Sequence, residues 1–210
     1  MANRQLSPSP SLTILLSLLL GAACGSIPFG YLVGRLRGID IRTRGSGNIG
    51  FTNVQRTMGW GWAVPVLGLD IAKGLVPTAL ASSLGLAPAL VGLGAVLGHV
   101  FTPWLRFNGG KGVATTIGVA AYLCTWSLLI GLVVYLAVLL ATGFISLSSL
   151  AFAAALPVLT AAIYPRSLAL LAFTIGVTLV IFIRHRSNMA RLAARTEPQL
   201  GLWRRLFHKP

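Results

Sequence analysis

The stretch VATTIGVAAYLCTWSLLIGLVVYLAVLLAT, residues 113–142, decides the fold of this chain, because it can form one long membrane helix or two short ones. Apolar segments continue on both sides of it. Taken as two helices, it completes a series of candidate membrane spans at 12–34, 62–84, 87–105, 112–125, 127–142, 145–163 and 167–183. Taken as one helix, it leaves six spans and moves the arginine-rich C-terminal tail to the opposite face of the membrane.

The distribution of charge favours the two short helices. With seven spans, 14 of the 17 lysines and arginines lie on one face, Arg4 and Arg166 lie on the other, and Lys73 lies inside. Short cytoplasmic loops carry an excess of basic residues. We therefore predict seven spans with the N-terminus outside and the C-terminus in the cytoplasm; five spans remain the alternative if two of the short segments are re-entrant or interfacial.

The composition is typical of a multi-span membrane protein. Of 210 residues, 55% are hydrophobic and 10% charged, and the mean hydropathy is +0.82, more than a soluble core of this size needs. The fold class is accordingly an all-α, polytopic membrane helix bundle of about seven transmembrane helices. A formal charge of +14 is also typical of proteins that bind nucleic acid, but the basic residues here sit in short segments between apolar runs, which the excess of basic residues in cytoplasmic loops explains.

The whole chain, 1–210, is predicted to be a single membrane domain without an internal repeat or a soluble part. The first apolar run continues past Cys24 to nearly a full span, longer than the core of a signal peptide. Cys24 and Cys124 both fall in apolar segments and are expected to be small buried residues. The C-terminal tail is expected to extend the last helix until Pro198 stops it.

The loop RTRGSGNIGFTNVQR, Arg42 to Arg56, is the richest polar segment between two spans. Glycine lets backbone N–H groups approach a phosphate closely, and short polar side chains and arginine can bind the same anion. The glycines are Gly45, Gly47 and Gly50, and the side chains are Ser46, Asn48, Thr52, Asn53 and Arg56. We interpret this loop as an anion site at the mouth of the bundle.

Two further polar clusters lie on the same face in the seven-span topology. GHVFTPWLRFNGGKGVATT, 98–116, has His99 near a helix end and a glycine-rich turn with Lys111 that leads into the next helix. A helix N-terminus with such a turn suits a phosphate, although Gly112 stands where a Walker A loop has serine or threonine. RHRSNMARLAARTEPQLG, 184–201, places His185 and Asn188 on one helical face.

Asp70, Lys73, Glu197 and the segment GSIPFG each have a structural interpretation. Asp70 and Lys73 lie three apart inside an apolar helix, where they can neutralise each other or contact a substrate. Glu197 is expected to pair with a nearby arginine. The segment GSIPFG, with Pro28 and Gly30, is expected to allow close helix packing.

Taken together, these segments resemble a known family. GSGNIGFTNVQRTMG, DIAKG, GHVFTPWLRFNGGKGVATT and RHRSNMARLAARTEP are similar to the signature regions of the PlsY family, the bacterial acyl-phosphate-dependent glycerol-3-phosphate acyltransferases. The resemblance runs in order from about Gly25 to Gly201. Phe51 departs from it, since a small residue is expected there. Ser146, in the turn FISLSS, resembles a family segment that contacts the substrate phosphate.

The resemblance implies transfer of a fatty acyl group from acyl phosphate to the 1-hydroxyl of glycerol 3-phosphate, without cofactor or metal. It also implies a bacterial cytoplasmic membrane and a site that faces the cytoplasm. The expected catalytic residues are Ser46, Arg56, Lys111, His185 and Asn188. The expected substrate-binding residues are Gly45, Gly47, Asn48, Gly50, Thr52, Asn53, His99, Gly109, Gly110, Gly112 and Ser146.

The mechanism leaves alternatives open. His99, His185 and His208 have no acidic residue four or five positions later, so an HxxxxD pair is missing. We hypothesise direct attack with a substrate phosphate oxygen, or His185, as proton acceptor; Ser46 as a covalent nucleophile is the runner-up. A transporter of organic phosphates would also have basic loops and helix breaks, but it predicts symmetry between halves that is not found. A purely structural subunit leaves the polar loops unexplained.

Overall fold

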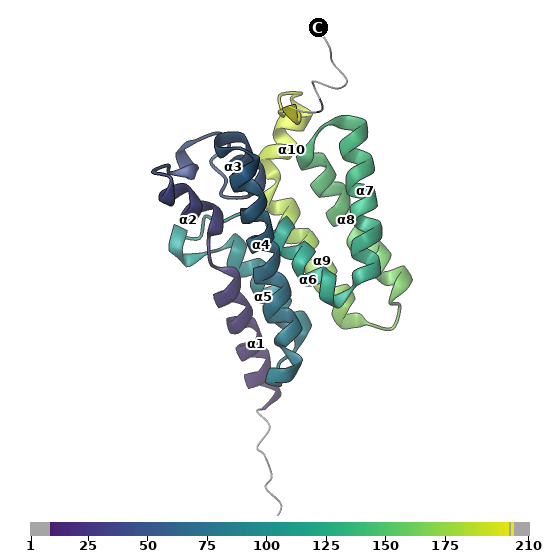
Figure 1. The fold of residues 1–210 in the computed structure, drawn as a ribbon. Helices are drawn as coiled ribbons and strands as arrows, with labels where there is room; N and C mark the ends of the chain where they lie inside the picture. Colours follow the sequence, from purple (N-terminus) through teal and green to yellow (C-terminus); the bar gives the residue numbers. More distant parts are fainter. Residues whose placement is uncertain (1–8, 202, 204–210) are drawn as a thin grey trace, which may run out of the picture.

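The computed structural model describes residues 9–201 and residue 203, which form a helical bundle (Figure 1). The described residues contain no strand. The α-helices are α1 (Pro10–Gly25), α2 (Phe29–Leu36), α3 (Phe51–Met58), α4 (Trp60–Leu80), α5 (Pro88–Val100), α6 (Val113–Leu123), α7 (Thr125–Thr142), α8 (Ile145–Ile163), α9 (Leu168–Arg184) and α10 (Arg186–Ala193). Short 3₁₀ helices are η1 (Ile41–Thr43), η2 (Ser82–Leu84) and η3 (Pro103–Leu105). Of the residues considered above, Arg4, Arg204, Arg205, His208 and Lys209 lie outside the described residues.

The stretch 113–142 forms two helices, as its surroundings predict. Cys124 separates α6 from α7 with φ −149° and ψ 60°, which are not helical values. Five regions of the described chain are long and apolar enough to cross a membrane, at 10–36, 60–80, 88–105, 125–142 and 145–163, and α9 with α10 makes a sixth if this bent pair is one span. α6 has 11 residues, hence a length of about 16 Å. The predicted membrane helix bundle is confirmed. By length and composition it has five or six spans where seven were predicted, because α6 is short.

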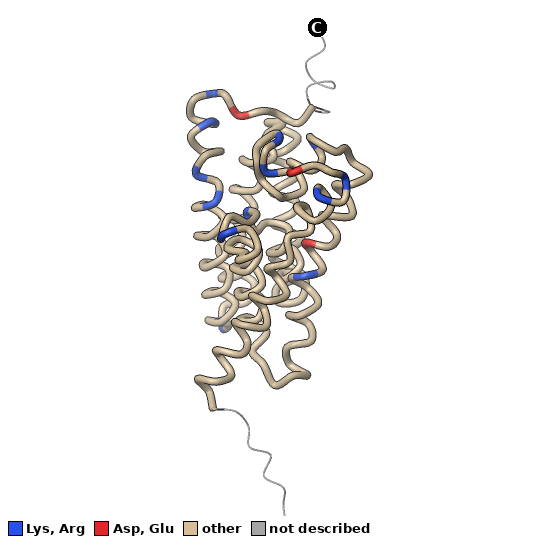
Figure 2. Tube along the Cα trace, turned by 90° about the vertical axis from the view of Figure 1, so that its left-hand side faces the viewer, with Lys and Arg blue, Asp and Glu red and all other residues tan. Residues whose placement is uncertain are grey.

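The polar segments gather at one end of the bundle, which we call the basic end. The segment 37–59, the turn 106–112 and the chain beyond Arg184 all lie there (Figure 1). Most lysines and arginines of the described residues lie toward the same end (Figure 2). The alternating direction of the apolar helices thus brings together the three polar clusters of the sequence.

Glycines let α1 and α5 pack closely. A Cβ at Gly21 or Gly25 would overlap the backbone of Val91 or Ala95 on α5, and a Cβ at Gly98 would overlap the backbone of Ala22. Small residues four apart allow such contact between membrane helices. Gly30 also packs closely, but against the loop before α3 instead of the expected helix, since a Cβ there would overlap the carbonyl of Ile49.

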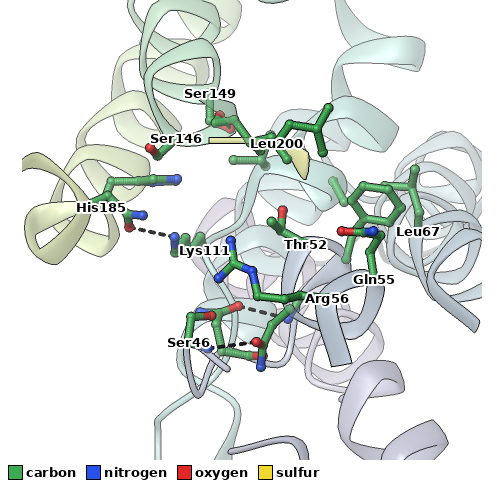
Figure 3. Close-up of a pocket in the computed structure, with 18 of the residues that line it drawn as sticks. Ser46, Thr52, Gln55, Arg56, Leu67, Lys111, Ser146, Ser149, His185 and Leu200 are labelled. Atoms are coloured by element: carbon green, nitrogen blue, oxygen red, sulfur yellow. Dashed lines mark hydrogen bonds between the residues drawn. The ribbon is translucent and has the colours of Figure 1, made fainter. Parts of the chain in front are cut away.

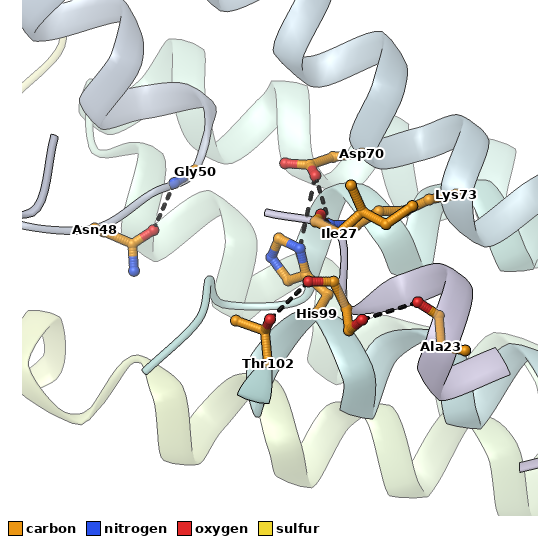
Figure 4. A network of polar contacts seen from close by, with 9 residues as sticks. Ala23, Ile27, Asn48, Gly50, Asp70, Lys73, His99 and Thr102 are labelled. Carbon is orange, nitrogen blue, oxygen red and sulfur yellow. Dashed lines mark hydrogen bonds and ion pairs between the residues drawn. The ribbon is translucent and has the colours of Figure 1, made fainter. Parts of the chain in front are cut away.

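The break between α1 and α2 exposes backbone carbonyls, which accept hydrogen bonds from side chains later in the chain. Lys73 Nζ of α4 donates to the Ile27 carbonyl over 2.7 Å, and Thr102 Oγ1 donates to the Ser26 carbonyl over 2.6 Å (Figure 4). Irregular backbone at membrane depth needs such partners, because lipid offers none. The predicted pair of Lys73 with Asp70 is also present, with 2.8 Å between Nζ and Oδ1.

The C-terminal tail differs from the expected straight extension of the last helix. α9 and α10 meet at an angle of 59°. His185 lies at this bend, and its Nδ1 is 2.8 Å from the Ile181 carbonyl. Beyond α10 the chain returns to the α7–α8 turn, where the Leu200 N–H donates to the Gly143 carbonyl over 2.8 Å. The bend therefore lays the tail across the basic end of the bundle.

Candidate active site

The loop before α3 is held in shape by Asn53. Its Nδ2 lies 3.1, 3.0 and 2.8 Å from the carbonyls of Ile41, Arg44 and Asn48, and its Oδ1 accepts the Ser46 N–H over 2.8 Å. Asn53 is buried and its polar atoms are engaged within the loop. Its observed role is to shape the loop that presents Ser46 and Asn48.

Gly45 and Gly47 provide the backbone conformations that this loop needs. Their φ angles are +56° and +71°, in the region that L side chains rarely adopt. A Cβ at Gly45 would also overlap Asn53 Oδ1. Gly50 differs, because its N–H donates to Asn48 Oδ1 over 2.9 Å and is engaged within the loop.

Ser46 and Arg56 present unengaged polar groups at the mouth of the cavity. Among the described residues, neither the Ser46 hydroxyl nor the Arg56 guanidinium makes a hydrogen bond, and both side chains are exposed. Figure 3 shows Arg56 of α3 reaching toward Lys111. Two cationic side chains on separate elements therefore converge on one space, which is suited to an anion.

Two backbone N–H groups of the glycine turn, those of Gly109 and Gly110, are engaged. The Gly109 N–H donates to the Val100 carbonyl over 3.0 Å, and the Gly110 N–H donates to the His99 carbonyl over 3.1 Å. On the other side, Arg184 donates to the carbonyls of Gly109 and Gly110 over 2.9 and 3.2 Å. The turn is thus fixed between α5 and α9, and it places the side chain of Lys111 at the cavity.

Lys111 begins a chain of polar contacts that reaches Arg191. Its Nζ donates to Asn188 Oδ1 over 2.6 Å, Asn188 Nδ2 donates to Glu197 Oε1 over 2.6 Å, and Arg191 Nε donates to Glu197 Oε2 over 2.6 Å. The last contact confirms the expected pairing of Glu197 with an arginine. Glu197 therefore fixes the orientation of the Asn188 amide, whose oxygen then faces Lys111.

The surroundings of these groups shift their pKa values. Burial lowers the pKa of Lys111 to about 8; the charge of Glu197 opposes the shift, and the nearby cations Arg191, Arg56 and Arg184 add to it. Burial by itself would raise the pKa of Glu197, but the hydrogen bonds from Asn188 and Arg191 bring that pKa below its usual value. At neutral pH the site thus holds a charged lysine that loses its proton near pH 8 and a carboxylate that stays ionised.

His185 and Ser146 close the cavity on the side of α8 and α9. Figure 3 shows the His185 ring pointing toward the cavity. If Nδ1 carries the proton and donates to Ile181, Nε2 keeps its lone pair. The Ser146 hydroxyl is buried. Both side chains offer polar atoms beside Lys111.

One cavity of about 680 Å³ joins these polar groups to an apolar region. Its volume is in the range of ordinary ligand sites. The apolar part lies between α4, α6, α7 and the start of α8, and it is lined by Leu67, Val113, Ala114, Ile117, Leu132, Tyr135, Leu139 and Ile145. Phe51 and Trp60 also line the cavity, with ring centroids 5.8 Å apart. The cavity can therefore hold a molecule with an anionic head and an apolar tail.

A second cavity of about 290 Å³ lies next to the first. It is polar, and arginines 184, 186 and 191 line it together with Asn108 and Ser187. The residues that line both cavities are Ser46, Asn48, Lys111, Asn188 and Arg191. Two anions can thus approach the same lysine from different sides.

The structure brings most of the predicted site residues together. Those that line the larger cavity are Ser46, Asn48, Gly50, Thr52, Asn53, Arg56, His99, Lys111, Gly112, Ser146, His185 and Asn188. Gly47 and Gly109 line the smaller one. Gly45 and Gly110 line neither, and their surroundings give them structural roles. Within the described residues, no group of three His, Cys, Asp or Glu side chains is placed to hold a metal ion.

Sequence reasoning missed several residues that line the larger cavity, including Gln55, Tyr135 and Ser149. Ser149 lies three residues after Ser146 on α8, so helical spacing could have indicated it. Tyr135 sits in a uniformly apolar stretch and carried no such signal. Asp70 also lines this cavity, in addition to its pairing with Lys73.

Comparison with known proteins places the chain in a family. The family model described as "Glycerol-3-phosphate acyltransferase" matches residues 15–195. The chain belongs to the glycerol-3-phosphate acyltransferase family. A relative of that name from Geobacter sulfurreducens is 46% identical over 176 residues, which cover 82% of this chain and 90% of the relative. Another, from Methylorubrum populi, is 44% identical over 190 residues, which cover 90% and 93%.

Solved structures agree with this placement in the glycerol-3-phosphate acyltransferase family. The crystal structure of PlsY, described as an integral membrane glycerol 3-phosphate acyltransferase in its glycerol 3-phosphate form, matches with a TM-score of 0.85 and 33% identity over 93% of this chain and 99% of PlsY. Its lysophosphatidic acid form matches with a TM-score of 0.83. The family resemblance and the helical membrane fold inferred from the sequence are confirmed.

Proposed function

We propose that this protein transfers a fatty acyl group from acyl phosphate to the 1-hydroxyl of sn-glycerol 3-phosphate. The hydroxyl oxygen forms a bond with the acyl carbonyl carbon, and the bond from that carbon to the phosphate oxygen breaks. The products are lysophosphatidic acid and inorganic phosphate. The reaction needs no cofactor, because acyl phosphate already carries a good leaving group.

The larger cavity is the observation that carries this proposal. Its cationic end, with Arg56, Lys111 and Arg191, suits a phosphate, and its apolar end between α4 and α7 suits a fatty chain. The smaller polar cavity meets it at Lys111. This arrangement supports a reaction in which a lipid-like phosphate and a second, polar phosphate meet at one group of cations.

The cationic side chains have the main chemical roles in this proposal. Arg56 and Lys111 bind substrate phosphates and stabilise the negative charge that develops on the carbonyl oxygen and on the leaving phosphate. The Ser46 hydroxyl adds a hydrogen bond to the same charge. Asn188 holds Lys111 in position, and His185 orients the glycerol hydroxyl toward the carbonyl carbon.

The hydroxyl proton passes to a substrate phosphate oxygen, with His185 Nε2 as the second candidate acceptor. A covalent acyl-serine route through Ser46 would need a base that activates this hydroxyl. Among the described residues, no histidine or carboxylate hydrogen-bonds the Ser46 hydroxyl, which supports direct attack.

The proposal includes a location and an orientation. The bacterial relatives support a bacterial cytoplasmic membrane, and the charge distribution supports an orientation with the basic end and its cavities on the cytoplasmic side. The helices between residues 10 and 193 pack into one bundle, which supports a single membrane domain. Both phosphate substrates would then reach the site from the cytoplasm.

Phosphate release by the purified protein in lipid tests the function. With acyl phosphate and glycerol 3-phosphate together, we expect inorganic phosphate and lysophosphatidic acid in equal amounts, and neither substrate alone should suffice. Comparable turnover with acyl-CoA in the absence of acyl phosphate would refute the proposed donor. Accumulation of glycerol 3-phosphate inside sealed vesicles without acylation would instead favour a transporter.

A further inference from the structure

The His99 ring lies directly beneath the glycine turn. His99 is 3% exposed and stands near the end of α5. A Cβ added at Gly110 would overlap His99 Nε2 and would lie 2.6 Å from Cε1, closer than real Cβ contacts. The ring therefore occupies the space that a side chain at position 110 would need.

Another edge of the His99 ring lies near α4. His99 Nδ1 lies 3.7 Å from Asp70 Oδ1, and Asp70 is paired with Lys73. Figure 4 shows these three side chains close together, to one side of the loop that contains Asn48 and Gly50. The buried ring thus lies between Asp70 of α4 and the glycine turn.

The neighbouring glycine meets a different obstacle. A Cβ at Gly109 would overlap the carbonyl oxygen of His99 and lie 2.8 Å from that of Val100, both of them backbone atoms. Removing the imidazole would leave this obstacle in place. The two adjacent glycines therefore respond differently to the same change at His99.

We infer that His99 is a positioning residue whose ring sets the height of the Gly109–Gly110 turn and thereby directs Lys111 into the cavity. Glycine is required at position 110 by this ring and not by the approach of a phosphate. Two observations agree: the Gly110 N–H is already bonded to the His99 carbonyl, and Gly110 lines neither cavity. Only the kinetic part of this inference rests on the proposed function.

A paired substitution tests the packing. Gly110→Ala should lower kcat/KM about tenfold or more, and adding His99→Ala should recover at least about threefold of that loss, because contacting residues couple. Adding His99→Ala to Gly109→Ala should recover nothing. Gly68→Ala on α4, where a Cβ meets nothing within 4 Å, is the control that should behave like the unmodified protein.

Thermal unfolding of the same variants in detergent gives a readout that is independent of the reaction. The double variant that combines His99→Ala with Gly110→Ala should unfold at a higher temperature than Gly110→Ala alone. If His99→Ala does not fold, His99→Asn, which also shortens the side chain, is used in its place. Strictly additive effects in both kcat/KM and Tm would overturn the packing inference. They would show instead that glycine is required at position 110 for binding the ligand.

Lys111→Met tests whether His99 acts through Lys111. A residue that only supports the fold would cost the same factor in kcat/KM with or without the lysine, whereas a positioning residue loses its effect once the group it directs is gone. We expect His99→Ala to cost several-fold in the unmodified protein and less than about twofold in the Lys111→Met background. Equal costs would overturn the positioning role. Failure of the proposed function would instead appear as an inactive unmodified protein, with the Tm coupling intact.

Discussion

Arg56 and Lys111 enter the polar end of the cavity from different elements, so they are suited to different contacts with the same anion. An arginine presents a flat fork of donors that matches two phosphate oxygens, which an ammonium cannot reproduce. Arg56→Lys should therefore restore only part of the activity that Arg56→Ala removes. Kinetics of the three proteins with both substrates measure this, and full recovery with lysine would show that charge alone matters.

The Ser46 hydroxyl is expected to act in the transition state without forming a covalent bond. Ser46→Ala should lose at least about tenfold in rate, equivalent to roughly 1.4 kcal/mol for one transition-state hydrogen bond. Quenching the enzyme after reaction with radiolabelled acyl phosphate alone separates the two mechanisms. Label that stays on Ser46 after denaturation would contradict direct attack.

Lys111 should give the reaction an alkaline limit. Its pKa of about 8 lies below the usual lysine value, so its positive charge is complete below pH 7 and is lost as the pH rises through 8. Since kcat/KM reports groups of the free enzyme, it should fall about tenfold per pH unit well above pH 8. In Lys111→Arg this limb should disappear, because a guanidinium stays charged; an unchanged limb would assign it to another group.

At this scale the sequence predicted which residues gather but not what each one contacts. Asn53 and Asn188 both belong to polar motifs that also contain glycine or histidine. Both were expected to contact substrate. In the structure Asn53 is fully engaged with loop carbonyls, whereas Asn188 orients Lys111. Hydrogen bonds between residues distant in the chain decide this difference, and no local pattern contains them.

Among the elements, the contact between α1 and α5 depends on glycines on both helices. Gly98→Leu should destabilise the protein by about 1–3 kcal/mol or more, because the side chain has to displace the backbone of Ala22. The matched change Gly68→Leu points into open space and should have little effect. Thermal unfolding in detergent compares the two, and equal losses would contradict the close packing.

Apolar periodicity located the helices well, and it failed where a helix changes direction. The span predicted at 145–163 has the bounds of α8. The bend at His185 was not predicted, because no proline or glycine stands next to His185 in the sequence. The tail's contacts with the α7–α8 turn accompany this bend, and such contacts are visible only in three dimensions.

For the molecule as a whole, the expected orientation can be measured directly. After Cys24 and Cys124 are replaced by alanine, a single cysteine at the exposed positions Arg37 or Arg166 reports the two ends of the bundle. We expect Arg37→Cys to react with an impermeant maleimide only in inverted vesicles and Arg166→Cys only in right-side-out ones. The reverse pattern would place the cavities outside the cell.

The contacts at the break between α1 and α2 set an order on biosynthesis. The bond from Lys73 to Ile27 joins residues 46 apart in the chain, and the bond from Thr102 to Ser26 joins residues 76 apart. While the ribosome has made only the first span, those carbonyls have neither partner, and hydrocarbon supplies no substitute. We therefore expect the break after α1 to gain its full set of hydrogen bonds only after α4 and Thr102 have been synthesised and inserted beside it.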